Sequence, residues 1–99
     1  MQEIEDYAAE CRAYWLSIGF SEEWADRLRR ETATALYGMY ENSHGSADRL
    51  ATFDGLLKIL RERIPVREKL AAVAAYLADA AVTHRPALAM IKTRAGIGC

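Results

Sequence analysis

The chain has 99 residues, which is enough for one domain with a modest hydrophobic core. Hydrophobic residues make up 52% of it and charged residues 27%, a balance that is typical of globular proteins and excludes a disordered chain. The formal net charge of −1 argues against general affinity for nucleic acid, because that affinity grows with the number of basic side chains placed against phosphates. We therefore expect a single helical domain over residues 1–99.

The cysteines and the apolar segments indicate the cellular compartment of the protein. Cys11 falls within a helical pattern and Cys99 is the last residue, and no secretory signal is apparent. We therefore expect a reduced, cytoplasmic protein. No apolar run approaches the length of a membrane span, so we expect no contact with a membrane.

The first helix is predicted over residues 3–18. Its apolar residues, from Ile4 through Trp15 to Ile18, follow helical spacing. This spacing favours a place in the core for Trp15. Gly19 stands where a left-handed cap would end the helix.

A second helix starts after Ser21 and is predicted over residues 22–41. Trp24, Leu28 and Met39 belong to one apolar row, which favours a place in the core for Trp24 as well. Residues 42–45 read Asn-Ser-His-Gly. All four are small, polar or turn-prone, so we expect a flexible loop there.

The clearest amphipathic helix is predicted over residues 47–64, with Ser46 as its N-cap and Pro65 marking its end. Its apolar stripe consists of Leu50, Phe53, Leu57, Leu60 and Ile64. Asp54-Gly55 could break this helix into two, but the stripe stays in phase across the glycine, which favours one helix. If Leu57 lies in the core, its truncation to alanine should cost about 2–5 kcal/mol.

Pro65 suits the start of a fourth helix, which is predicted over residues 66–84. Its stripe consists of Val66, Leu70, Val73, Leu77 and Ala81. Arg85-Pro86 marks a break, and a short fifth helix is predicted over residues 87–95. Because no strand signal is present, the sequence predicts an all-α fold, a compact four- to five-helix bundle.

The sequence offers no set of residues for catalysis, cofactor binding or metal binding. The candidate metal ligands are Cys11, His44, His84 and Cys99. No two of them have ligand spacing such as CxxC or HxxxH. The chain also lacks a GxSxG motif for a nucleophile and a glycine-rich loop for a phosphate. We therefore expect a protein that is not an enzyme and uses neither a cofactor nor a metal.

Aromatic residues are concentrated in residues 1–40, where several arginines lie among them. Tyrosine, tryptophan and arginine dominate the binding energy of protein interfaces. So many tyrosines are hard to bury together in a small domain, so we expect part of this region to contact another protein. The predicted partner-binding residues are Tyr7, Arg12, Tyr14, Arg27, Arg30, Tyr37 and Tyr40.

The functional hypothesis is a non-enzymatic protein–protein interaction module. The expected activity is that of a small inhibitor or adaptor that binds and blocks a surface of a larger protein complex. An anti-CRISPR-like inhibitor of phage or mobile-element type is one example, suggested by small size and the lack of chemistry. A homodimer is a further option, because an acidic N-terminal stretch could meet a basic C-terminal stretch of a second copy.

The alternative hypothesis is a small helix-turn-helix DNA-binding regulator that uses residues 76–94. These residues could form two helices around a tight turn. Arg85, Lys92 and Arg94 would supply its contacts to nucleic acid. The match is weak, because the second helix lacks the Asn, Gln or Arg clusters that read base edges.

Overall fold

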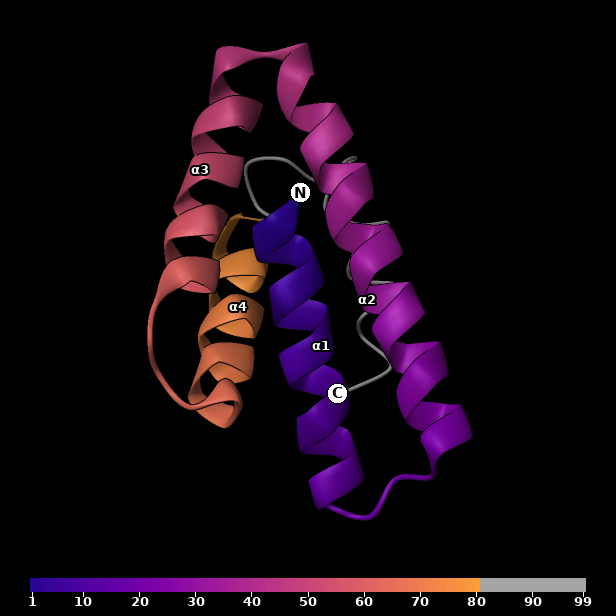
Figure 1. The fold of residues 1–99 in the computed structure, drawn as a ribbon. Helices are drawn as coiled ribbons and strands as arrows, with labels where there is room; N and C mark the ends of the chain where they lie inside the picture. Colours follow the sequence, from indigo (N-terminus) through magenta and orange to yellow (C-terminus); the bar gives the residue numbers. More distant parts are fainter. Residues whose placement is uncertain (81–99) are drawn as a thin grey trace.

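The computed structural model describes residues 1–80, which form four α-helices that run alternately in opposite directions (Figure 1). The elements are α1 (Gln2–Ser17), α2 (Glu22–Asn42), the 3-10 turn η1 (Ser43–Gly45), α3 (Ala47–Arg61) and α4 (Val66–Ala80). The described residues contain no strand, so the predicted all-α bundle is confirmed. Residues 81–84 of the predicted fourth helix and the predicted helix 87–95 lie outside the described residues.

The end of α1 confirms the predicted left-handed cap at Gly19. Gly19 has a φ of 104°, which glycine adopts without strain. Its amide donates to the carbonyl of Leu16 at 3.2 Å, and the amide of Phe20 donates to the carbonyl of Trp15 at 3.0 Å. These two bonds form a Schellman motif, which ends the helix and turns the chain toward α2.

Two serines cap the N-termini of α2 and α3. Ser21 Oγ accepts a hydrogen bond from the amide of Trp24 at 3.1 Å. Ser46 Oγ accepts one from the amide of Arg49, also at 3.1 Å. Each serine satisfies a first-turn donor that has no partner within its helix. The predicted starts of these helices, at residues 22 and 47, are confirmed.

Residues 42–45 form a helical connection, and the prediction of a flexible loop there is wrong. Asn42 completes α2, and the next three residues form η1. Ser43 is buried, and its hydroxyl donates to the carbonyl of Tyr40. The ring of His44 packs edge-on against that of Tyr40, with 5.1 Å between the centroids. These contacts fix a stretch whose composition alone indicates only a turn.

Helix α3 ends at Arg61, before the predicted end at Ile64. Glu62 is extended, with φ −64° and ψ 140°, so the chain leaves the helix there. Pro65 disfavours helical geometry at Ile64, and a contact from α4 takes up a carbonyl of the last turn. Lys69 Nζ donates to the carbonyl of Leu60 at 3.1 Å, and this is the carbonyl that the amide of Ile64 would use in a longer helix.

The core lies where the four helices meet, and α1 runs between α2 and the pair α3 and α4 (Figure 1). Its buried members are Ile4, Tyr7, Cys11, Ala35, Leu36, Met39, Phe53, Leu56, Leu57, Leu60 and Val73. The predicted stripe on α3 is confirmed for Phe53, Leu57 and Leu60. Leu50 is 48% exposed, because α1 and the described part of α4 do not reach that end of α3 (Figure 1).

Helix α4 contributes a buried lysine that its apolar stripe does not predict. Lys69 is 4% exposed, and besides the Leu60 carbonyl its ammonium contacts a carboxylate oxygen of Glu10 at 3.3 Å. A buried ammonium needs such partners, because an uncompensated buried charge costs about 3–5 kcal/mol. One side chain therefore joins α4 to α3 and to α1. The apolar stripe itself packs less tightly, because Val66, Leu70 and Leu77 are only partly buried against the core.

Helix α3 is continuous through Gly55, which confirms the predicted single helix. The glycine accommodates a close approach from α4. The Tyr76 hydroxyl donates to the carbonyl of Thr52 at 2.6 Å, and the end of its ring lies against Gly55. A Cβ at this position would collide with the Tyr76 hydroxyl.

We expect Leu57→Ala to lower the free energy of unfolding by about 2–5 kcal/mol, because Leu57 is buried and its truncation leaves a cavity. Leu50→Ala, in the same helix, is the matched control and should cost less than about 1 kcal/mol. Urea denaturation followed by circular dichroism measures both values. Equal losses for the two variants would contradict this assignment of the core.

We expect Gly55→Ala to bring no gain in stability, because the new methyl group displaces Tyr76 and breaks its bond to Thr52. In a Tyr76→Ala background the same substitution should stabilise the protein by about 1 kcal/mol, the usual helix-propensity difference. Urea unfolding of the four proteins gives both effects. An equal gain in the two backgrounds would show that Tyr76 does not impose the glycine.

Candidate protein-interaction surface

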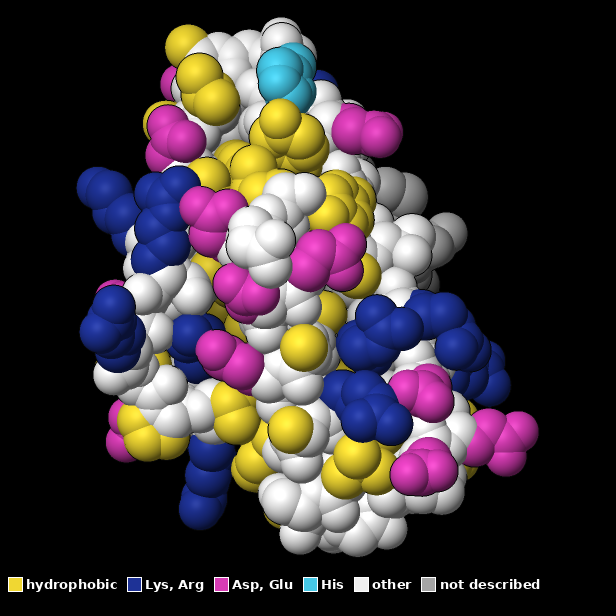
Figure 2. Space-filling model, in the orientation of Figure 1, with side chains coloured by type: hydrophobic (Ala, Val, Ile, Leu, Met, Phe, Trp, Pro, Cys, Tyr) yellow, Lys and Arg dark blue, Asp and Glu magenta, His cyan; other side chains and the backbone are white. Residues whose placement is uncertain are grey.

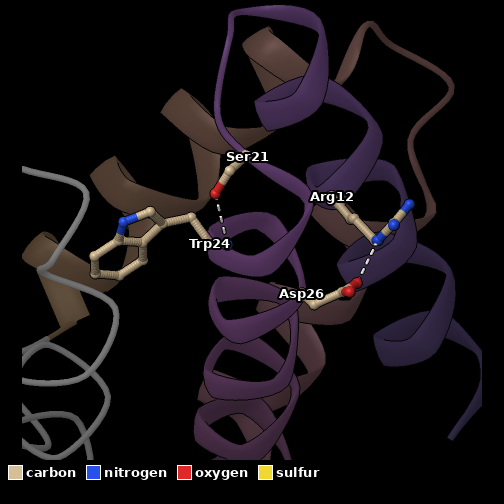
Figure 3. Close-up of polar contacts among 4 residues, drawn as sticks. All are labelled: Arg12, Ser21, Trp24 and Asp26. Carbon is tan, nitrogen blue, oxygen red and sulfur yellow. Dashed lines mark hydrogen bonds and ion pairs between the residues drawn. The ribbon is translucent and has the colours of Figure 1, made fainter.

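Large apolar side chains stay exposed where α1 and α2 join. They are Ile18, Phe20 and Trp24, at 53%, 42% and 51% exposure, and we call them the α1–α2 corner. The predicted place of Trp24 in the core is therefore wrong, because this side chain projects from the side of α2 that faces away from α1 (Figure 3). Ile18 lies just past the end of α1, which stops at Ser17. Trp15 is partly buried and packs against the core, as its spacing predicts.

An ion pair fixes α2 against α1 beside the corner. Arg12 Nε donates to Asp26 Oδ1 at 2.6 Å (Figure 3). The hydrogen bond from Arg12 lowers the pKa of Asp26 below its ordinary value. Trp24 lies two residues away and points in the opposite direction from Asp26, so the contact that orients α2 also directs the indole outward (Figure 3).

Arg27 lies beside the exposed indole. Its guanidinium carbon is 5.2 Å from the centroid of the Trp24 ring, within the range of a cation–π contact. Arg27 Nε also donates to a carboxylate oxygen of Glu31 at 3.3 Å, one turn further along α2. The surface therefore presents tryptophan and arginine side by side, two of the residue types that contribute most to binding at protein interfaces.

Acidic and basic side chains follow one another along the first half of α2. Glu22 and Glu23 lie in its first turn, and the exposed Arg27 and Arg30 lie further along. Figure 2 shows basic side chains gathered over this part of α2, with acidic side chains toward the start of the helix. The exposed face of α2 therefore carries acidic side chains in its first turn and basic side chains in the turns that follow.

Two of the predicted partner-binding tyrosines form contacts within the protein. The Tyr37 hydroxyl donates to a carboxylate oxygen of Glu5 at 2.8 Å and accepts a hydrogen bond from the ammonium of Met1 at 2.7 Å. Tyr40 packs against Phe53 with 5.4 Å between the ring centroids. Both tyrosines are half-buried, and the structure does not bring them to the corner.

The other predicted residues are divided between surface and interior. Arg12 is held by Asp26, Tyr14 is half-buried, and Arg27 and Arg30 are exposed on α2. The nucleic-acid-binding candidates Arg85, Lys92 and Arg94 lie outside the described residues. Among the predicted set, Arg27 is the residue that contacts Trp24.

Sequence reasoning missed Ile18 and Phe20 as candidate surface residues. The available signal was their position on either side of Gly19, where the chain leaves α1. An apolar residue at such a helix end has no neighbour three or four positions ahead in the same helix. Its burial then depends on what the next helix covers, and α2 leaves both side chains exposed.

Tyr7 and Cys11 are titratable groups buried one turn apart on α1. Tyr7 is 3% exposed, so the prediction that it contacts a partner is corrected: its ring fills the core. Burial raises the pKa of Cys11 to about 12 and also raises the pKa of Tyr7 well above its ordinary value. A thiol that stays protonated is a poor nucleophile and a poor metal ligand, so Cys11 acts as a core residue.

A cavity of about 420 Å³ lies between α1, the end of α3 and the start of α4. Glu3 and Arg61 at its wall form an ion pair at 2.7 Å, and Glu10 pairs with Lys69 at 3.3 Å. The hydrogen bond from Arg61 lowers the pKa of Glu3. These charges hold helices together, so the cavity is a weaker candidate for function than the corner.

Among the described residues, no group of three His, Cys, Asp or Glu side chains could hold a metal ion. No helix in residues 1–80 is long and apolar enough to cross a membrane. No protein-family model matches the chain, and comparisons with curated proteins and with solved structures find no significant match. The role of the corner is therefore inferred from its geometry and chemistry.

We expect the free energy of unfolding to fall as the pH rises from about 9 toward about 12. The unfolded chain ionises Cys11 near 9, the ordinary value, whereas the folded chain keeps the thiol neutral. The contribution of Cys11 is therefore complete below that pH and is lost above it. Cys11→Ala removes this contribution, so its stability should fall less between about pH 7 and about pH 10. Urea unfolding at both pH values measures the difference, and equal losses in the two proteins would contradict the role of Cys11.

Proposed function

We propose that this protein is a non-enzymatic binding module that contacts another protein through the α1–α2 corner. The observation that carries the proposal is the joint exposure of Ile18, Phe20 and Trp24 at one end of the molecule. Exposed apolar side chains that are grouped on a small protein are typical of an interaction site. Arg27 beside Trp24 adds a charged residue type that is frequent at binding hot spots.

Two potentially reactive side chains, those of Cys11 and Lys69, are engaged in folding contacts, which supports recognition over catalysis. Cys11 is buried and protonated, and Lys69 is held by Leu60 and Glu10. A catalytic nucleophile or base has to reach a substrate in the protonation state that the reaction needs. The exposed corner has no such requirement, since binding needs only a complementary partner.

Within this class we propose a small inhibitor or adaptor that covers a surface of a larger protein complex, of phage or mobile-element type. Charged residues lie beside Trp24, with Glu22 and Glu23 in the same helical turn and Arg27 against the indole, which resembles the apolar centre and polar rim of protein interfaces. The buried free thiol of Cys11 fits a reducing, cytoplasmic setting.

An affinity pull-down of the full chain from its native host, quantified by mass spectrometry, tests the proposal. We expect Trp24→Ser to weaken binding of a specific partner by about 30-fold, because truncating a central interface residue costs about 2 kcal/mol or more. The variant should fold, since the Trp24 side chain is half-exposed and does not belong to the hydrophobic core of residues 1–80.

Leu50→Ser is the matched control for this experiment. Leu50 is an apolar residue with a similar exposure, 48%, and it lies near the start of α3. We expect the control to recover the same partner as the wild-type chain. Full recovery by Trp24→Ser, with circular dichroism showing native helicity, would contradict the proposal that the corner is the contact surface.

A further inference from the structure

We infer that the partner at the α1–α2 corner is a second copy of this chain, packed with the two α2 helices antiparallel across a twofold axis. The inference rests on the part of the proposed function that assigns protein contact to the corner, and it names a second copy, in place of a larger complex, as the occupant of that surface. It is carried by the order of charges along α2 around Trp24. A twofold contact requires one surface that is complementary to itself.

The charges of interest share one face of α2. Glu23, Arg27 and Arg30 are spaced by four and three residues, so they lie in one row on the helix, and all three are exposed. Arg27 pairs with Glu31 of its own helix. Within the described residues, Glu23 and Arg30 belong to no ion pair. An acid and a base of this row are therefore available to another molecule.

Antiparallel packing brings these charges together. Glu23 and Arg30 are separated by about 10 Å along the axis, at 1.5 Å per residue. When a second α2 runs in the opposite direction about an axis midway between Glu23 and Arg30, Glu23 of each copy lies opposite Arg30 of the other, and this attraction occurs twice. A parallel arrangement would instead place like charges together, which costs free energy at an interface.

The apolar part of the surface fits the same arrangement. Trp24 borders the charged row next to Arg27, and Ile18 and Phe20 precede it in the chain. A twin seated on the row would lie against Trp24 on each copy, and the removal of this exposed side chain from water would favour the association. The patch is small, so we expect a reversible dimer and not an obligate one.

The balance of charge favours a twin over a partner of a single sign. Residues 22–31 contain the acids Glu22, Glu23, Asp26 and Glu31 and the arginines Arg27, Arg29 and Arg30. A strongly acidic or strongly basic partner would meet repulsion over part of this stretch. A second copy meets attraction at both ends of the row, where Glu23 of one chain faces Arg30 of the other, while each Arg27 near the axis keeps its own partner Glu31.

Sedimentation velocity of the full chain, from about 1 µM to about 1 mM, tests the inference across the range of weak interfaces. We expect a monomer–dimer equilibrium that weakens by about tenfold or more in Glu23→Arg and in Arg30→Glu, since each substitution places like charges opposite one another twice. The combined variant Glu23→Arg/Arg30→Glu should restore the dimer. Trp24→Ser should weaken it with no change in charge, and circular dichroism confirms that each variant is folded.

A chain that stays monomeric over the whole range would overturn the inference. So would a dimer that is indifferent to all three single substitutions, because it would use another face. Failure of the combined variant to restore association would exclude the proposed antiparallel pairing. If Glu23→Arg fails to fold, Arg30→Glu and Trp24→Ser still test the surface.

These outcomes are separate from those of the pull-down. A monomeric chain whose Trp24→Ser variant still loses a host protein would leave the proposed function intact and exclude the twin. A dimer that depends on Trp24, together with a pull-down that the substitution does not affect, would support the twin and exclude a host partner at the corner.

Discussion

The packing of α1 is the constraint on which the rest of the structure depends. This helix lies between α2 and the pair α3 and α4, and it contacts all three (Figure 1). Ile4, Tyr7 and Cys11 fill that position at steps of three and four residues, and each is almost fully buried. Because protein interiors are close-packed, a change of side-chain volume along this row would disturb the packing of the other three helices.

That arrangement also explains why a surface is left over. Helix α2 joins the main core cluster through Ala35, Leu36 and Met39 in its second half, whereas its first half buries only Ala25. The first half of α2 is held to α1 by the Arg12–Asp26 pair, which is partly exposed and contributes orientation more than stability. Trp24 therefore has a fixed position without being buried. Rigid presentation of an aromatic side chain reduces the entropy that is lost when a partner binds.

Much of the fold could be predicted from the sequence because it depends on local rules. Ser21 and Ser46 begin helices by capping first-turn amides, and Gly19 ends one by adopting a conformation that other residues avoid. The row on α3 predicts the burial of Phe53 and Leu57, since spacing identifies the residues that share a face.

The remaining features could not be predicted because they depend on which helix covers which face. Spacing places Trp24 in an apolar row, but no property of α2 alone determines whether a neighbour covers that part of the row. The burial of Lys69 depends on a carbonyl of α3 that the sequence does not place nearby. The same contact takes up a carbonyl that a longer α3 would use. The predicted partner-binding residues therefore include the exposed Arg27 and Arg30 of α2 but none of the apolar residues of the corner.

The fluorescence of Trp24 tests most directly whether the corner is a contact surface occupied by a second copy. A Trp15→Phe chain contains Trp24 as its single tryptophan, so its emission reports on the corner alone. If the chain dimerises through the corner, the emission of Trp24 should be typical of an exposed indole in dilute protein. Its emission maximum should move to shorter wavelength as the protein concentration rises. Glu23→Arg should abolish the shift. Emission that stays constant over the whole concentration range would contradict burial of the corner by a twin.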